Sequence, residues 1–159
     1  MHKRLLAAAF ACVLMLAGAP PVFAQTYYLD DKTSCIFDFS QVIDEETVIH
    51  CGDNVKLTFL GHYGTDKENL RVWTTPLEHV TESLNDEDID FYIFGALPKF
   101  ARPVKVSIRA GEGTFLYEYT QDGELRLVDA AYEDGEWVFE AKTLGAYLVT
   151  EEEYPEGSL

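Results

Sequence analysis

An acidic run from residue 85 to residue 90 is the first place where residue types and spacing suggest chemistry. Aspartates at every second position match positions one, three and five of a calcium-binding loop: Asp86, Asp88 and Asp90. The match fails further on, because Phe91 stands where the loop needs glycine and Leu97 where it needs a bidentate glutamate. We predict a solvated loop and no metal site, with weak, non-specific Ca²⁺ binding by Asp86–Asp90 as the alternative.

Histidine and serine show no catalytic or zinc-binding pattern. The histidines beyond residue 24 form no HxH or HExxH pair: His50, His62 and His79. No serine lies between glycines as it does in a nucleophile elbow. Among the 28 acidic residues, none has the distinctive setting of a glycosidase carboxylate. We predict a non-catalytic protein without a cofactor. A small glycan hydrolase is an alternative that needs two carboxylates in one pocket.

Two aromatic residues are candidates for contact with a ligand. Trp73 lies on the face of its predicted strand opposite Leu70 and Val72, and Tyr63 lies in the Gly61–Gly64 turn. Aromatic rings that point outward can stack on sugar rings or anchor a protein partner. A sandwich also needs bulky residues between its sheets, and burial of Trp73 there is the interpretation that we favour.

The cysteines that follow residue 24 have alternating flanks, which fit a pair of antiparallel strands. With Cys35 opposite Cys51, Phe37 lies opposite Ile49 and both sulfur atoms share a face. The CxxC spacing of redox and metal pairs is absent. We therefore predict a structural disulfide, worth roughly 3 kcal/mol through loop-closure entropy.

The charge balance excludes two classes of partner. Of 159 residues, 28 are acidic and 12 basic, and the net charge of −16 becomes −18 when Lys3 and Arg4 leave with a signal segment. Binding to nucleic-acid phosphates or to anionic lipid requires a basic surface. With 47% hydrophobic residues, the chain is too apolar for disorder and can bury a core. We predict a folded acidic protein that binds neither nucleic acid nor anionic membranes.

The first 24 residues are organised like a secretion signal. A positive start at His2–Arg4 precedes an apolar stretch from Leu5 to Ala19, and Val22–Ala24 places small residues three and one before a cut. We predict cleavage before Gln25 and a secreted protein, associated at most with the cell surface, without a membrane anchor. A lipid anchor on Cys12 is the less favoured alternative.

Most of the remaining chain alternates between apolar and polar residues with the period of β-strands. The clearest run, residues 104–109, places Val, Val and Ile on one face and Lys, Ser and Arg on the other. Asp-Gly pairs at 122–123 and 134–135 are typical of tight hairpin turns. We predict an all-β sandwich of two mainly antiparallel sheets with about nine or ten strands at the usual spacing.

One short helix interrupts the strands. The run from Thr75 to Glu78 matches a capping box with proline at the first helical position. An apolar stripe follows, formed by Leu77, Val80 and Leu84. We expect this helix to plug an open end of the sandwich or to cross between its sheets. Residues 25–150 are predicted to form a single domain, followed by an acidic tail at 151–159.

Several segments from about Asp88 onward carry a resemblance: Asp88–Phe94, Phe100–Ile108, Phe115–Tyr119, Gly123–Leu125, Val128–Tyr132 and Lys142–Val149. They resemble uncharacterised β-rich modules of secreted and cell-surface proteins of gut Firmicutes, in which a similar Thr-Leu-Gly-x-Tyr segment ends the last strand. The resemblance implies an extracellular β module and implies neither an activity nor binding residues.

We therefore predict a non-catalytic, secreted bacterial module that acts in adhesion or in interactions of the cell envelope. Its partner is an extracellular protein or glycan that the sequence does not identify. A carbohydrate-binding module that uses Trp73 and Tyr63 is the first alternative, and the glycan hydrolase is the second.

Overall fold

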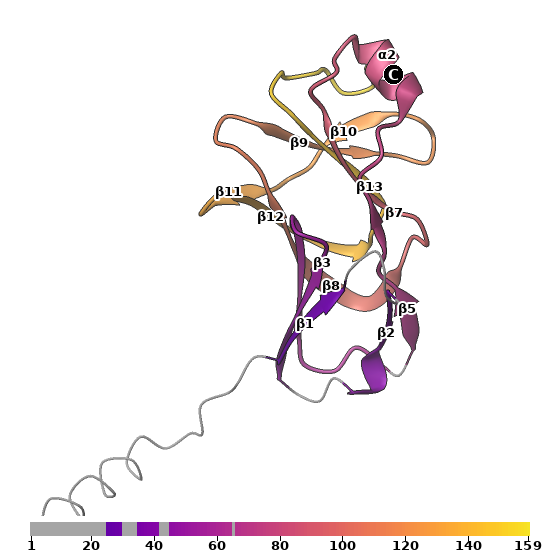
Figure 1. Ribbon diagram of the computed structural model, residues 1–159, viewed down its shortest axis with the longest axis vertical. Helices are drawn as coiled ribbons and strands as arrows, with labels where there is room; N and C mark the ends of the chain where they lie inside the picture. The colour runs from indigo at the N-terminus through magenta and orange to yellow at the C-terminus, as the bar shows by residue number, and fades with distance from the viewer. Residues whose placement is uncertain (1–24, 30–34, 42–44, 65) are drawn as a thin grey trace, which may run out of the picture.

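The computed structural model describes residues 25–29, 35–41, 45–64 and 66–159, and all structural statements below concern these residues. The predicted signal segment, residues 1–24, and Cys12 within it lie outside them. The described chain forms thirteen strands, one α-helix and a 3-10 helix at Phe39–Gln41 (Figure 1).

The strands form three sheets. The largest has the order β1-β3-β4-β8-β12-β11 and comprises Gln25–Leu29, Glu46–Cys51, Val55–Leu60, Lys99–Arg109, Glu136–Thr143 and Ala131–Glu133. The second has the order β10-β9-β13-β7-β6 and comprises Leu125–Leu127, Phe115–Tyr119, Ala146–Thr150, Asp90–Phe94 and Val72–Trp73. The third contains β2 (Ile36–Asp38) and β5 (Lys67–Asn69).

The predicted all-β, mainly antiparallel sandwich is confirmed. Every strand pair is antiparallel except β1 with β3, which is parallel. The described residues hold more strands than predicted and a small third sheet. The additional strands are mostly two or three residues long, and so short a run contains too little alternation to be recognised from sequence.

The two larger sheets share one hydrophobic core between their inner faces. On β8, Val104, Val106 and Ile108 are 0% exposed, as the alternation predicts. The five-stranded sheet contributes Tyr92, Phe94, Leu116, Tyr147 and Val149. These side chains join the two sheets into one packed body through burial of apolar surface.

A second core covers the outer face of the five-stranded sheet. Its buried members are Val80, Ile89, Phe91, Tyr117, Leu125 and Leu148. Val80 belongs to the helix, α2 (Glu78–Leu84), and Leu77 and Leu84 pack beside it, which confirms the predicted stripe. The expectation that the helix plugs an end or crosses between the sheets is wrong, because α2 lies against this outer face (Figure 1).

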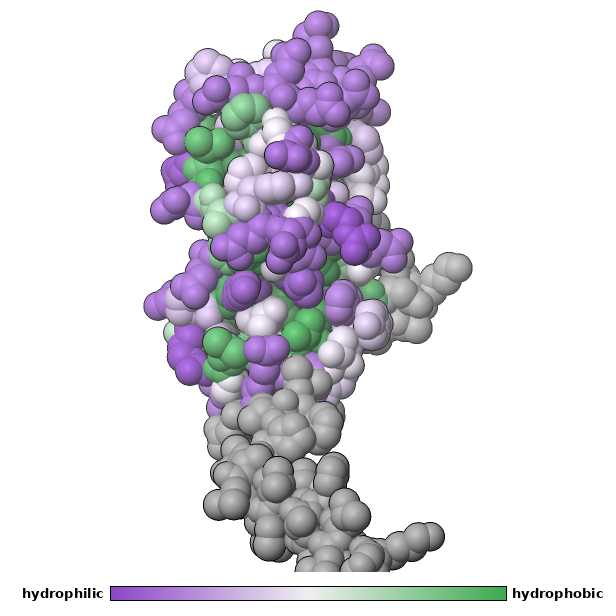
Figure 2. Space-filling model, turned by 90° about the vertical axis from the view of Figure 1, so that its left-hand side faces the viewer, coloured by the Kyte–Doolittle hydropathy of each residue, from purple (hydrophilic) through white to green (hydrophobic). Residues whose placement is uncertain are grey.

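The start of the helix also differs from the prediction. Helical hydrogen bonding begins at Glu78, Leu77 is the N-cap, and no side chain caps the helix, so the capping box at Thr75 is wrong. The helix ends at Asn85, which adopts the left-handed conformation with φ 52°. Hydrophilic residues cover this end of the molecule, at the top of Figure 2.

The predicted tight turns are confirmed. Asp134 and Gly135 both have positive φ, 51° and 83°, as a type I′ turn between β11 and β12 requires. Gly123, in the hairpin between β9 and β10, has φ 85° and donates its backbone N–H to the carbonyl oxygen of Thr120 at 3.0 Å. Both turns are positions where glycine adopts a conformation that most residues avoid.

The predicted pairing of the strands next to the cysteines is wrong. Strand β2 pairs with β5, which places Phe37 opposite Glu68, whereas Ile49 on β3 lies opposite β4. The structure contains no disulfide between Cys35 and Cys51, and both side chains are buried. Alternation within a strand indicates which side chains share a face, but it does not specify which strand is the neighbour.

The C-terminal segment, residues 151–159, packs on the outer face beside α2 rather than extending away. The backbone N–H of Tyr154 donates to the hydroxyl of Tyr117 at 2.7 Å, and that hydroxyl donates to the carbonyl oxygen of Tyr154 at 3.1 Å. The Tyr154 hydroxyl donates to Oδ2 of Asp86 at 2.7 Å. Burial and the hydrogen bond to Asp86 both raise the pKa of Tyr154. These contacts join the segment to β9 and to the turn after α2.

The substitution Tyr154→Phe tests this attachment. It removes a hydrogen bond to a carboxylate while keeping the ring, so the free energy of unfolding should fall by about 1–2 kcal/mol in urea titrations. Tyr28→Phe is the matched control, because Tyr28 is 76% exposed. Equal unfolding midpoints for the two variants would show that the Tyr154–Asp86 hydrogen bond does not stabilise the fold.

Candidate functional site

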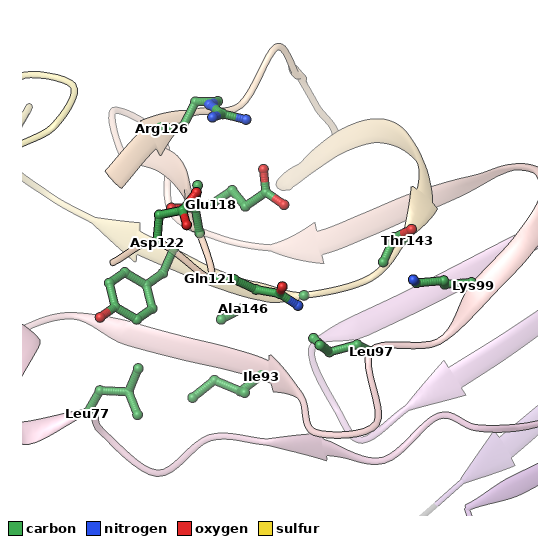
Figure 3. Close-up of a pocket in the computed structure, with 13 residues that line it drawn as sticks. Leu77, Ile93, Leu97, Lys99, Glu118, Gln121, Asp122, Arg126, Thr143 and Ala146 are labelled. Atoms are coloured by element: carbon green, nitrogen blue, oxygen red, sulfur yellow. The ribbon is translucent and has the colours of Figure 1, made fainter. Parts of the chain in front are cut away.

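A groove of about 620 Å³ opens on the outer face of the five-stranded sheet (Figure 3). Its apolar lining comes from the residue before α2, from β7 and the turn after it, and from β13: Leu77, Ile93, Leu97 and Ala146. Its polar side chains come from the β9–β10 hairpin and the nearby ends of β8 and β12: Lys99, Glu118, Gln121, Asp122, Arg126 and Thr143. In Figure 3 the two sets face each other across the groove. Such a surface can contact the apolar face of a ligand and hydrogen-bond its polar groups.

A row of side chains crosses the sheet along this groove. Tyr119 lies opposite Ala146, Ala146 opposite Ile93, and Ile93 opposite Trp73, so four neighbouring strands each contribute one residue. We call these four residues the platform row. Residues in register on adjacent strands point to the same face, and three strand spacings amount to about 14 Å. The platform row therefore has an aromatic ring at each end and smaller side chains between them.

Helix α2 holds one end of the platform row. Nε2 of His79 lies 2.9 Å from the hydroxyl of Tyr119, and the two rings are 5.7 Å apart in a tilted arrangement. His79 belongs to the first turns of α2, whose buried stripe fixes the helix on the sheet. The packing of the helix therefore determines where the Tyr119 ring lies.

Trp73 forms the other end of the platform row and is 44% exposed. The guanidinium carbon of Arg71 lies 3.7 Å from the centroid of its ring. Burial of Trp73 between the sheets, the interpretation favoured from the sequence, is therefore wrong. Strand β6 is an edge strand of two residues, and it turns Val72 rather than Trp73 toward the main core.

The turn between β7 and β8 lies against the Trp73 end of the platform row. A side-chain Cβ at Gly95 would lie 2.8 Å from Nε1 of Trp73, so only glycine fits beneath the indole. Two residues later, Leu97 adopts a left-handed conformation with φ 47° and lines the groove. A leucine in this conformation costs about 1–3 kcal/mol, and such strain is concentrated at functional sites.

Tyr63, the second predicted aromatic, lies elsewhere. Its ring meets Phe59 edge to face at 4.9 Å and packs against the main core, and its hydroxyl donates to the carbonyl oxygen of Pro103 at 2.7 Å. The guanidinium of Arg102 lies 4.6 Å from the ring centroid. The structure thus places Tyr63 at the main core and Trp73 on the outer face, and it does not bring them together.

The polar side of the groove continues toward the main core. Glu118 on β9 lies opposite Arg126 on β10 and opposite Tyr147 on β13. Burial, and secondly the charge of Glu118, raise the pKa of the Tyr147 hydroxyl. Tyr147 itself belongs to the main core and does not line the groove, so its protonated hydroxyl lies on the far side of Glu118 from the groove.

The acidic run is tied into the fold through Asp86. Asp86 accepts the backbone N–H of Asp88 at 2.9 Å and the hydroxyl of Tyr154, so its carboxylate connects the turn to the C-terminal segment. Within the ranges that the structure describes, no group of three His, Cys, Asp or Glu residues could hold a metal ion. Glu68, a carboxyl group whose pKa burial raises, lies on β5 and does not line the groove.

No protein-family model matches this chain. No curated protein matches it by sequence either. Among the described residues, no helix has the length and apolar character needed to cross a membrane.

Sequence reasoning found Trp73 but missed Tyr119 and Arg71. Tyr119 ends the run Phe115–Tyr119, and its place beside Ala146 depends on a strand pairing that local alternation does not contain. Arg71 precedes Trp73 by two positions, and side chains two apart on a strand share a face. That spacing was the available signal for the Arg–Trp stack.

The substitution Gly95→Ala tests the packing at the Trp73 end. The added methyl group would displace the indole from the turn, so the emission of Trp73 should shift to longer wavelength in a Trp137→Phe background. Gly111→Ala is the control, because its Cβ would meet only Thr114 at 3.8 Å. An unchanged emission spectrum in Gly95→Ala would contradict the close approach.

Proposed function

We propose that this chain is a non-catalytic, secreted bacterial β-sandwich module that acts in adhesion or in interactions of the cell envelope. The platform row and the groove beside it are its binding surface, and an extracellular glycan or protein is its partner. The observation that carries the proposal is the row from Tyr119 to Trp73, which has an aromatic ring at each end and stands partly open to solvent.

The chemistry of this surface supports binding rather than catalysis. Aromatic rings offer a large contact area at a low cost in conformational entropy, and partly exposed rings of this kind anchor many binding surfaces. The groove supplies side-chain donors and acceptors on the side opposite its apolar lining. The hydrolase alternative needs a carboxyl group with a raised pKa in the groove. Glu118 and Asp122 line the groove, but Glu68, the carboxyl group whose pKa is raised, does not.

Secretion is supported by the sequence of residues 1–24 and by the resemblance to extracellular modules of gut Firmicutes. The surplus of 28 acidic over 12 basic residues also suits a soluble domain in a crowded extracellular medium.

The carbohydrate-binding alternative is favoured by one specific observation. The aromatic rings of Tyr119 and Trp73 are separated by the smaller side chains of Ala146 and Ile93. This arrangement forms a shallow surface that suits a chain of sugar rings.

Binding to envelope material tests the proposal. Residues 25–159 are applied to an array of cell-wall and host glycans and to intact cell-wall preparations, with Trp73→Ala beside the wild type. Loss of Trp73 should weaken binding at least tenfold, because an aromatic residue that anchors a binding surface commonly contributes about 2 kcal/mol or more. Tyr28→Ala is the matched control, since Tyr28 is an aromatic residue exposed elsewhere, on β1. Equal binding by wild type and Trp73→Ala would reject the platform row as the binding surface.

We further propose that Cys35 and Cys51 form a disulfide after secretion. Both side chains are buried, and the neighbouring charge of Cys35 adds to burial in raising the pKa of Cys51 to about 12, which indicates that the two thiols are close. A bridge would tie the segment before β2 to the end of β3, in a different sheet. This connection would restrict the unfolded chain and stabilise the fold by roughly 3 kcal/mol.

Mass spectrometry after alkylation tests the bridge. In protein purified from an oxidising compartment, the two cysteines should react with the alkylating reagent only after reduction. Reduction should also lower the melting temperature of the wild type and leave that of a Cys35→Ser variant unchanged. Full alkylation of unfolded, unreduced protein would rule the bridge out.

A further inference from the structure

We infer that the platform row binds a sugar that carries an isolated carboxylate, and that Arg71 is the residue that receives this carboxylate. The inference rests on the proposed function and specifies the ligand class for the same surface. It follows from the position of Arg71, from the cations around the groove and from the distribution of the acidic residues.

The guanidinium of Arg71 is held in place without an acidic partner. It stacks on the indole of Trp73 at 3.7 Å, and its Nε is buried without a hydrogen-bond partner. The salt bridges found in the described part of the chain are Lys56–Glu136 and Lys67–Asp38. Arg71 is in neither, although acidic residues outnumber basic ones by 28 to 12.

The terminal nitrogens of Arg71 are consequently available to a ligand. Among the described residues, only the Nε of this side chain is both buried and unsatisfied, and no hydrogen bond involves its two Nη atoms. A guanidinium whose plane is fixed by stacking presents a rigid pair of donors, which matches the geometry of a carboxylate. Trp73 keeps 44% of its surface exposed beside these donors.

Two further cations line the groove next to the platform row. Lys99 and Arg126 also lack a carboxylate within salt-bridge distance in the described ranges, and the Lys99 amine points toward the groove in Figure 3. Strand register connects these positions, because Trp73 lies opposite Ile93, which lines the groove. A ligand with its rings on the platform row therefore meets positive charge at Arg71 and again at Lys99.

The acidic residues around the groove and the helix favour a ligand that carries few negative charges. Glu118 and Asp122 line the same groove, and acidic residues crowd the helix end of the sheet: Glu78, Glu82, Asp86, Glu87, Asp88 and Asp90. A heavily sulfated polymer would be repelled by these charges, whereas one carboxylate is held locally at Arg71. The aromatic ends favour a ring-bearing ligand over an acidic peptide, because sugar rings present flat apolar faces to them.

Calorimetry with matched tetrasaccharides tests the inference. The probes are a tetrasaccharide of three neutral sugars and one uronic acid, which carries a single carboxylate, and its carboxyl-reduced counterpart. Each is titrated into residues 25–159 of the wild type, Arg71→Gln, Lys105→Gln and Trp73→Ala. The wild type should bind the acidic sugar about tenfold more tightly than the reduced sugar. Arg71→Gln should bind both equally and weakly. Lys105 is an exposed cation on β8, so Lys105→Gln controls for the loss of one charge.

The remaining outcomes separate this inference from the proposed function. Equal binding of the two sugars by the wild type, or a preference that survives in Arg71→Gln, overturns the carboxylate assignment. Tighter binding of a highly sulfated oligosaccharide or of a Glu-rich peptide overturns the ligand class. If no tetrasaccharide binds while Trp73→Ala still loses binding to cell-wall material, the inference fails and the proposed function stands. If Trp73→Ala binds that material like the wild type, the proposed function fails.

Discussion

The candidate site depends on one constraint, which is that the five-stranded sheet is apolar on both faces. In β7, Tyr92 and Phe94 point into the main core, while Phe91 points to the second core on the outer face. In β13, Tyr147 and Leu148 divide in the same way. Burial of such side chains contributes about 25 cal/mol per Å² of apolar surface, so the outer face must also be covered. The chain covers it with α2 and with its C-terminal segment.

Helix α2 is shorter than the five-stranded sheet is wide, and the platform row lies where the sheet stays partly exposed. A seven-residue helix is about 10 Å long, whereas four strand spacings across five strands amount to about 19 Å. Helix α2 packs against the row that contains Phe91, Tyr117 and Leu148. In the next row, its His79 contacts the hydroxyl of Tyr119. The residues beyond it stay partly exposed, with Trp73 at the open edge of the sheet. The proposed binding surface is thus the part of an apolar sheet that its own helix does not cover.

The sequence predicted the features that depend on neighbouring residues and missed those that depend on strand order. The buried face of β8 and the turn at Asp134 were predictable, because side-chain alternation and positive φ are local properties. The parallel pairing of β1 and the partner of β2 were not, because several strands offer equivalent alternation. The same limit hid the platform row. Local alternation assigns each of its residues to a strand. Only the register of four strands places Tyr119 and Trp73 on one surface.

The position of Arg71 also shows how an acidic chain can keep a cation available. An ion pair would fix the side chain but would use the donors that recognise a ligand. Stacking on an indole fixes the guanidinium through its face and leaves its edge unoccupied, because the interaction involves the ring electrons and not the N–H groups. Lysine could not replace it, since an ammonium is strongly hydrated and has no plane to stack. Gly95 completes the arrangement, because the absence of a side chain there lets the indole lie close to the turn that carries Leu97 to the groove.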